Sequence, residues 1–325
     1  MPAWRNISLW MDQLDEPLLA RPALERDLDV DVAIIGAGYT GLWTAYYLKR
    51  QAPGLDIAIV EAQTAGFGAS GRNGGWLMGN ILGEDRLLAN LPAEQRRAAY
   101  ELLHGIPDEV EIVLEREGID CDYRKGGALY CAARYPEQEA SLREYLDKLY
   151  QQGLSEREYR WLSPEQLAQQ IRIAKPYGGI FAPHVATIHP AKLVRGLART
   201  VERMGVRIYE NSPVTHWQSG SLRTAKASVR TRWVVPAVEG YAATLPGLGR
   251  YQLIRAFRTA TGLTPHAYLI NAKVNRGRQL LNQGQALAQV AYQLGFADQS
   301  HFQRVFKAHV GVTPGQYRGG SSPAQ

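Results

Sequence analysis

Three glycines near the start of the chain have a spacing that lets a peptide backbone approach a phosphate group. Residues 36–41 read G-A-G-Y-T-G, which is the pattern G-x-G-x-x-G. In this pattern the first glycine makes a tight turn, the second admits a pyrophosphate, and the third lets a helix pack closely on a strand. An acid about 20 residues downstream can accept hydrogen bonds from a ribose. The candidate contacts with such a dinucleotide are Gly36, Gly38, Tyr39, Thr40, Gly41 and Glu61.

The segments around these glycines are the ones that dinucleotide binding requires. Residues 31–35 form a strand-like run, and residues 42–50 have the apolar spacing of a helix. Residues 57–60 predict a second strand, which ends at Glu61. The N-terminus of the helix offers free N–H groups to phosphates. This order favours a dinucleotide-binding unit over a chance glycine turn. An acid at the end of the second strand disfavours the 2′-phosphate of NADP, while NAD and FAD both stay open.

A second glycine-rich run follows closely, because residues 66–75 read G-F-G-A-S-G-R-N-G-G. With this run, the sequence resembles the D-amino-acid-oxidase-like (DAO) family of FAD-dependent oxidoreductases, in the branch of amine and amino-acid oxidases. The resemblance implies an α/β, Rossmann-like domain with FAD as its cofactor and a small amine or amino acid as its substrate. It also implies that the second run touches the flavin, largely through its backbone, with Arg72 and Asn73 as polar contacts. The residues concerned are Ala69, Ser70, Gly71, Arg72, Asn73, Gly74 and Gly75.

The resemblance covers about residues 9–249, and we assign no chemistry to the lead-in at residues 1–28. Residues 206–215 resemble the family segment whose backbone meets the adenine side of FAD, so Val214 is a further candidate contact. Residues 233–241 resemble the strand and turn that return to the pyrophosphate.

Three features of this oxidase-like part depart from the family, and one of them is Val238, which stands where a threonine is usual. Pro236 cannot donate a hydrogen bond in what should be a buried strand. After residue 249 the remainder of the family's substrate sheet does not follow. We therefore expect an incomplete DAO fold in which the catalytic residues are unknown and turnover is doubtful.

The basic charge of the chain is concentrated after residue 249. Residues 250–325 contain nine Lys or Arg residues and one acid, Asp298, and so carry a net charge of +8. Because the whole chain carries +6, the first 249 residues together carry −2. A basic segment of this kind indicates contact with nucleic acid.

The apolar pattern of the same segment predicts a helix-turn-helix. Helices are expected at residues 265–283, 286–294 and 298–309, with a turn at residues 295–297 and Asp298 as the cap of the last helix. Apolar residues of the second helix should face those of the turn and the last helix. These residues are Leu287, Val290, Ala291 and Leu294 on one side and Phe296, Phe302, Val305 and Phe306 on the other.

Two stretches of this segment, residues 295–307 and 311–318, resemble the signature of the AraC/XylS family of transcription regulators. The resemblance implies that four residues enter a DNA major groove, where Arg304 would suit guanine and Gln299 adenine. Lys307 and Arg278 would meet phosphates. A solvated helix face is the alternative. The expected DNA-binding residues are Gln299, Ser300, Gln303, Arg304 and Lys307, together with Tyr251 and Arg255 of an incomplete first unit.

Composition sets the remaining limits. None of the apolar runs reaches the roughly 18 residues of a membrane span, so we expect a cytoplasmic protein. The two cysteines, Cys121 and Cys131, lack the spacing of a zinc site, and no metal is expected. The expected domains are the lead-in, the truncated oxidase at residues 29–249, the helix-turn-helix at residues 250–318 and a disordered tail at residues 319–325.

The sequence thus predicts a fusion of two truncated proteins, an oxidase fragment and a DNA-binding module. The first hypothesis is a flavoprotein of the amine or amino-acid oxidase type. The alternative is a DNA-binding transcription regulator whose N-terminal part is vestigial or responds to flavin. A third reading is a chain that folds in part and does neither.

Overall fold

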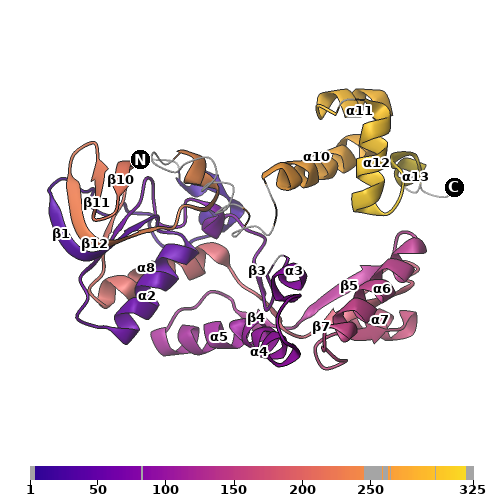
Figure 1. Ribbon diagram of the computed structural model, residues 1–325, viewed down its shortest axis with the longest axis horizontal. Coiled ribbons are helices and arrows are strands. Elements are labelled where there is room, and N and C mark those ends of the chain that lie inside the picture. The colour runs from indigo at the N-terminus through magenta and orange to yellow at the C-terminus, as the bar shows by residue number, and fades with distance from the viewer. Residues whose placement is uncertain are drawn as a thin grey trace. The chain divides into compact units, whose positions relative to one another are not determined.

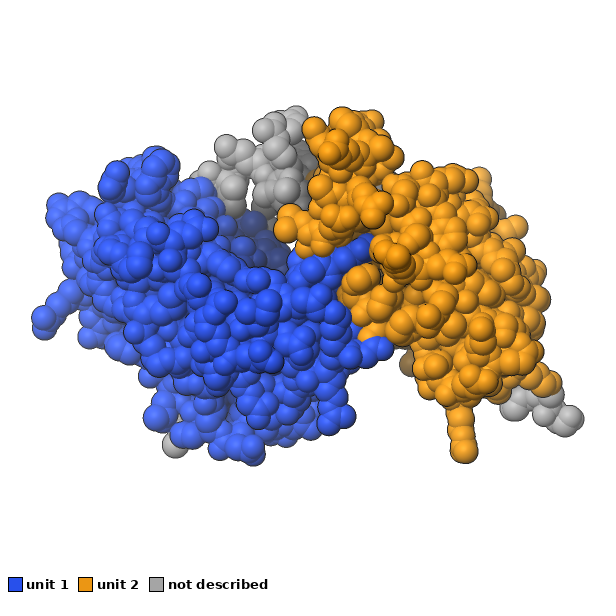
Figure 2. Space-filling view, turned by 90° about the horizontal axis from the view of Figure 1, so that it is seen from below, with its two compact units in different colours: residues 1–79, 104–126, 185–253 blue, residues 80–103, 127–184, 254–325 orange. Residues whose placement is uncertain are grey.

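The computed structural model describes residues 4–81, 83–244, 258, 263, 265–296 and 298–319. The chain divides into two compact units, each assembled from segments that are distant in the sequence (Figure 2). Unit 1 comprises residues 1–79, 104–126 and 185–253, and unit 2 comprises residues 80–103, 127–184 and 254–325. Within the described ranges, no helix is long and apolar enough to cross a membrane.

Unit 1 is built on a six-stranded sheet with the order β10-β11-β12-β1-β2-β9 (Figure 1). Strands β12, β1, β2 and β9 pair in parallel, whereas β11 pairs antiparallel with β10 and with β12. The strands are β1 (Leu28–Ile35), β2 (Ile57–Val60), β9 (Arg207–Tyr209), β10 (Val214–Gln218), β11 (Ser221–Thr224) and β12 (Ser228–Pro236). The two predicted strands of the dinucleotide-binding unit are therefore confirmed as β1 and β2.

Apolar side chains bury both faces of this sheet. On one face, Val32 and Ile34 of β1 belong to a cluster with α2 (Tyr39–Gln51), α5 (Ile106–Glu117) and α8 (Pro190–Arg203). On the other face, Ala33 and Ile35 pack with side chains of β11 and β12. Because both faces are covered, residues 32–35 of β1 form the unbroken apolar run of a central parallel strand.

Shorter elements complete unit 1. A small sheet has the order β3-β8-β4, with β3 at Trp76–Met78, β4 at Arg124–Lys125 and β8 at Val185–Thr187. The lead-in is folded, because it contains η1 (Trp4–Ile7) and α1 (Leu9–Asp12). Two further short helices are η2 (Ala69–Gly71) and η3 (Glu239–Thr244).

One part of unit 2 is a three-stranded antiparallel sheet with helices. The sheet has the order β5-β7-β6, with β5 at Ala128–Ala132, β6 at Arg160–Leu162 and β7 at Gly178–Ala182. The helices are α3 (Glu84–Leu88), α4 (Ala93–His104), α6 (Glu137–Gln151) and α7 (Pro164–Gln170). Tyr100 of α4, Leu146 and Leu149 of α6 and Ile180 of β7 share one buried cluster.

The C-terminal part of unit 2 is helical, as predicted. It contains α10 (Pro265–Asn282), α11 (Leu287–Gln293), α12 (Gln299–Val310) and α13 (Pro314–Gly319), of which α13 was not anticipated from the sequence (Figure 1). Phe302 and Phe306 of α12 are fully buried against Val290 and Ala291 of α11. The predicted packing of the helix-turn-helix is therefore confirmed.

Candidate functional site

The first and third glycines of the G-A-G-Y-T-G turn are required by close backbone contacts. Gly36 has a φ of +105°, and a Cβ atom there would lie 2.5 Å from the carbonyl oxygen of Ala237. A Cβ atom on Gly41 would lie 2.1 Å from the carbonyl oxygen of Gly36. The structure thus has the tight turn and the close helix-to-strand packing that the spacing predicts.

The second glycine faces the second glycine-rich run. A Cβ atom on Gly38 would lie 2.9 Å from Oγ of Ser70, and the same Oγ accepts a hydrogen bond of 2.9 Å from the N–H of Tyr39. Two motifs that lie about 30 residues apart in the sequence are therefore in contact. Tyr39 and Thr40 begin α2, and the N–H groups of the first turn of a helix have no partner within that helix. Ser70 takes the N–H of Tyr39, and the turn leaves backbone N–H groups beside it for an anion.

Glu61, at the end of β2, completes a site that we call the cradle, which consists of the turn at residues 36–41 and this carboxylate. Its Oε2 accepts a hydrogen bond of 2.8 Å from the N–H of Ala37, and its Oε1 accepts one of 2.9 Å from the N–H of Gln63. Burial raises the pKa of the Glu61 carboxyl, and these two backbone donors oppose that rise by favouring its charged form. Each carboxylate oxygen keeps a second lone pair, so a ribose hydroxyl can still donate to Glu61.

The turn before β10 lies beside Glu61. The N–H of Ser212 donates to the carbonyl oxygen of Glu61 over 2.9 Å, and the N–H of Asn211 donates to that of Gln63 over the same distance. Val214 follows this turn as the first, half-buried residue of β10. The structure therefore brings the predicted adenine-side segment to the end of β2, next to the predicted ribose ligand.

The side chains of Arg72 and Asn73 are engaged within unit 1. Arg72 is exposed and donates a hydrogen bond of 2.8 Å to the hydroxyl of Tyr241, and its guanidinium lies 5.0 Å from the ring centre of Phe67. Asn73 donates from Nδ2 to the carbonyl oxygen of Ser70 over 3.1 Å and accepts at Oδ1 from the N–H of Gly75 over 2.9 Å. Their role as polar contacts of a cofactor stays a prediction.

Pro236 does not interrupt the sheet. It is the last residue of β12, where it is exposed, and the N–H of the next residue, Ala237, donates to the carbonyl oxygen of Ile35 over 2.8 Å. The ladder therefore continues directly after the proline. The expectation of a lost ladder bond inside a buried strand was wrong, because Pro236 is exposed and the neighbouring Ala237 supplies the hydrogen bond to β1.

The residues of this cradle fit a dinucleotide. The glycines allow the tight turn and the close approach of α2 and Ser70, the N-terminus of α2 supplies N–H groups for phosphates, and Glu61 supplies an acceptor for ribose. The sequence pattern could find these groups. It had no signal for the hydrogen bond between Arg72 and Tyr241, which joins residues 169 positions apart.

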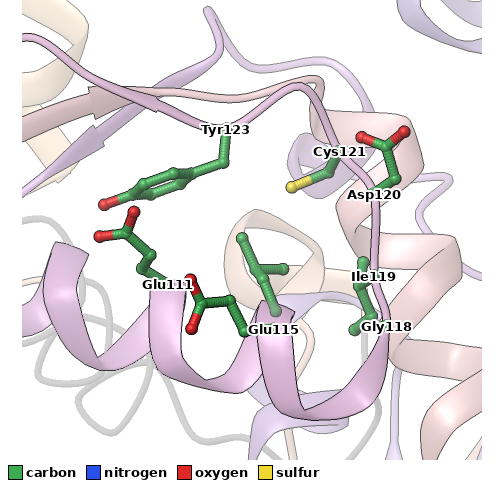
Figure 3. Close-up of a pocket in the computed structure, with 8 residues that line it drawn as sticks. Glu111, Glu115, Gly118, Ile119, Asp120, Cys121 and Tyr123 are labelled. Carbon is green, nitrogen blue, oxygen red and sulfur yellow. The ribbon is translucent and has the colours of Figure 1, made fainter.

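A separate cavity of about 450 Å³ lies between α5 and the loop that follows it (Figure 3). Glu111 and Glu115 project from α5 toward Tyr123, and Cys121 lies on the loop. Burial, with a smaller effect of Asp120, raises the pKa of the Cys121 thiol to about 12, so the thiol stays protonated at neutral pH. The predicted cofactor contacts do not line this cavity, and its thiol is poorly suited to nucleophilic chemistry.

The second candidate site is the outer face of α12. Asp298 caps this helix, as predicted, because its side chain accepts a hydrogen bond of 2.6 Å from the N–H of His301. Phe302 and Phe306 bury one face. The predicted DNA-contacting residues lie on the same helix, where all are exposed except the half-buried Gln303: Gln299, Ser300, Gln303, Arg304 and Lys307.

The other three predicted DNA contacts, Arg278, Tyr251 and Arg255, do not lie on α12. The Nε of Arg278, which was expected to meet a phosphate, donates to the hydroxyl of Tyr317 over 3.3 Å. Tyr251 and Arg255 lie outside the described residues. Among the described residues, the expected DNA-binding surface is therefore reduced to the outer face of α12.

Comparison with known proteins places both parts in families. Residues 31–281 match the family model of the FAD dependent oxidoreductases (DAO), and residues 279–318 match that of the bacterial regulatory helix-turn-helix proteins of the AraC family.

Among curated relatives, gamma-glutamylputrescine oxidoreductase of Escherichia coli is 31% identical over 222 residues, which are 67% of this chain and 51% of that protein. The transcriptional regulator MtrA of Neisseria gonorrhoeae is 38% identical over 72 residues, which are 22% of this chain and 24% of that protein. The chain thus spans about half the length of the oxidoreductase that it resembles.

Among solved structures, glycine oxidase from Bacillus cereus superimposes with a TM-score of 0.54 at 22% identity, over 66% of this chain and 57% of that one. This likeness concerns the fold. Together with the family matches, it shows that the chain belongs to the FAD dependent oxidoreductase (DAO) family and carries a helix-turn-helix of the AraC family at its C-terminal end.

Proposed function

We propose that unit 1 binds FAD, with the pyrophosphate at the G-A-G-Y-T-G turn and the ribose of the adenosine at Glu61. The observation that carries this proposal is the contact between the two glycine-rich runs, in which Ser70 docks on the N–H of Tyr39 beside Gly38. A glycine turn that arose by chance would not have the second run of the family folded against it. NAD-binding turns need no such partner, so this contact favours FAD.

Each group of the cradle has a defined task toward the cofactor. Thr40 and Gly41 offer N–H groups at the positive end of α2 to the phosphates. Glu61 accepts from the ribose, and Val214 meets the adenine side. When bound, the flavin would supply the acceptor for a hydride from the C–N bond of an amine or amino acid. The substrate class rests on family membership, and the chain spans about half of its oxidoreductase relatives.

Titration of the purified chain with FAD, followed by quenching of flavin fluorescence, tests the proposal. Gly38→Ala would place a methyl group 2.9 Å from Oγ of Ser70 and should weaken binding at least tenfold, since the side chain displaces the second run or the pyrophosphate. Gly54→Ala is the matched control, because a Cβ atom there has no neighbour within 4 Å. A wild-type chain that takes up no FAD would refute the proposal.

We further propose that α12 binds DNA, so that the chain is an oxidoreductase-like flavoprotein with a DNA-binding end. The specific observation is the division of α12 into a buried face at Phe302 and Phe306 and an exposed face with Arg304 and Lys307. The net charge of +8 on residues 250–325 provides the general attraction to phosphates.

Fluorescence anisotropy with labelled duplex DNA, at salt concentrations of about 50 and 200 mM, tests this second proposal. Arg304→Ala and Lys307→Ala should each weaken binding. Lys148→Ala is the matched control, since Lys148 lies on α6 and pairs with Glu144 over 2.7 Å. If the wild-type chain fails to bind at the lower salt concentration, α12 is only a solvated helix face.

A further inference from the structure

The lead-in segment holds two carbonyl groups of the second glycine-rich run. The hydroxyl of Ser8 donates to the carbonyl oxygen of Gly71 over 2.8 Å, and the indole Nε1–H of Trp10 donates to the carbonyl oxygen of Asn73 over 2.8 Å. Both bonds join residues 63 positions apart, and both are partly buried. The sequence pattern of residues 4–14 does not predict these two hydrogen bonds.

Shape complementarity accompanies the hydrogen bonds. Met11 is fully buried, and a Cβ atom on Gly71 would lie 2.6 Å from its Cε. A Cβ atom on Gly75 would lie 3.5 Å from the indole ring of Trp10. The missing side chain of Gly71 therefore makes room for Met11, whereas the indole of Trp10 lies at an ordinary contact distance from the Gly75 position.

The lead-in is itself firmly anchored. The guanidinium of Arg5 donates to the carbonyl oxygens of Asp12, Leu14 and Glu16 over 3.0, 2.7 and 3.1 Å, which fixes the fold of the segment. The carboxylate of Glu16 pairs with Arg195 of α8 over 2.5 Å. The segment can therefore act as a support that ties the glycine-rich run to α8.

The two bonds decide which backbone groups the run presents. Gly71 and Asn73 direct their carbonyl oxygens to the lead-in, while no partner is found among the described residues for the N–H groups of Asn73 and Gly74. Phosphates and the carbonyl groups of a flavin ring are hydrogen-bond acceptors, and a run that binds them through its backbone must offer N–H groups. Consecutive free N–H groups form a site for acceptors.

We propose that Ser8 and Trp10 are positioning residues of the cofactor site, which fix residues 71–75 so that N–H groups, and not carbonyl oxygens, face the flavin. This inference rests on the proposed function, because it assigns the orientation of the run to FAD binding. It adds the lead-in, to which the sequence assigned no chemistry, to the binding machinery.

The test compares variants that remove one donor at a time. Trp10→Phe keeps an aromatic ring and removes the indole N–H, and Trp233→Phe, at a site 66% exposed on β12, is its control. Ser8→Ala removes the hydroxyl, which also caps α1 by accepting from the N–H of Met11 over 3.2 Å, and Ser8→Thr restores both bonds. The readouts are amide hydrogen exchange of residues 66–75 without FAD, the overall unfolding midpoint, and the Kd for FAD.

We expect Trp10→Phe and Ser8→Ala to speed exchange in residues 66–75 and to raise the Kd for FAD about two- to tenfold, as loss of one hydrogen bond predicts. Trp233→Phe and Ser8→Thr should leave both unchanged. Exchange that rises equally throughout unit 1, or a Kd equal to that of the wild type, would overturn the inference. If the wild type binds no FAD, the proposed function fails, and unchanged exchange in Trp10→Phe would separately reject the support by the lead-in.

Discussion

Replacing Gly41 by alanine is the sharpest perturbation of the cradle. The new Cβ atom would lie 2.1 Å from the carbonyl oxygen of Gly36 and 3.2 Å from Cγ2 of Ile34. An ordinary contact begins at 3.4 Å, and the nearer neighbour is backbone, so α2 and the glycine turn must separate by more than an ångström. A flexible side chain cannot absorb this change.

The magnitude follows from two opposing effects. Alanine in a helix is favoured over glycine by about 1 kcal/mol. Overpacking a tight contact costs about 1–3 kcal/mol, and more where the backbone must move. We therefore expect a net loss of about 1–2 kcal/mol in the free energy of unfolding of unit 1, together with weaker FAD binding, because the N-terminus of α2 leaves its place.

The assay is denaturant unfolding followed by far-ultraviolet circular dichroism, on the full chain, with FAD titration of the same samples. Gly54→Ala serves again as the control, since its Cβ atom would meet no neighbour. If Gly41→Ala is as stable as Gly54→Ala and binds FAD as tightly as the wild type, Gly41 is not in close contact with Gly36 and Ile34, and this prediction is wrong.

Three further predictions concern other groups of the chain. Asp298→Ala should destabilise the C-terminal helices by about 1 kcal/mol through loss of the cap on His301 N–H, which thermal melting can detect, while Asp298→Asn should restore most of it. Burial raises the pKa of the Cys121 thiol to about 12, so the folded state keeps a proton that the unfolded state releases near pH 9.0. The free energy of unfolding should therefore fall as pH rises between these two values. Cys121→Ala should lack this pH dependence, and an identical dependence in the variant would contradict the prediction. Lys307→Ala should lower the salt dependence of DNA binding by about one unit of slope, whereas Arg304→Ala should chiefly lose discrimination between sequences, and anisotropy titrations that show the reverse would exchange their assigned roles.

The local elements of the cradle could be predicted from the sequence. The glycine spacing, the apolar runs and the acid at Glu61 are close together in the chain, and each carries a known geometric requirement. The same is true of the helix-turn-helix, where Asp298 and the buried Phe302 and Phe306 follow from capping and helical periodicity. Apolar alternation and helical periodicity depend on residues that are close in the sequence, and these local patterns were sufficient to predict the strands and helices of both regions.

Long-range contacts could not be predicted in this way. The bonds from Ser8 and Trp10 to residues 71 and 73, and from Arg72 to Tyr241, join side chains whose own neighbours in the sequence give no pattern. The effect of Pro236 could not be predicted either, because it depends on where β12 ends, and the sequence does not give that position. The helix α13 was missed because a segment of six residues, with two glycines and a proline, has little periodicity to recognise.

Hydrogen exchange of the full chain with and without FAD is the most direct test of FAD binding by unit 1. We predict that FAD slows exchange at residues 36–42 and 69–75 and leaves α12 (Gln299–Val310) unchanged. Protection that is absent from both glycine-rich runs, or that appears only elsewhere in the chain, would contradict the assignment of unit 1 as the site of FAD.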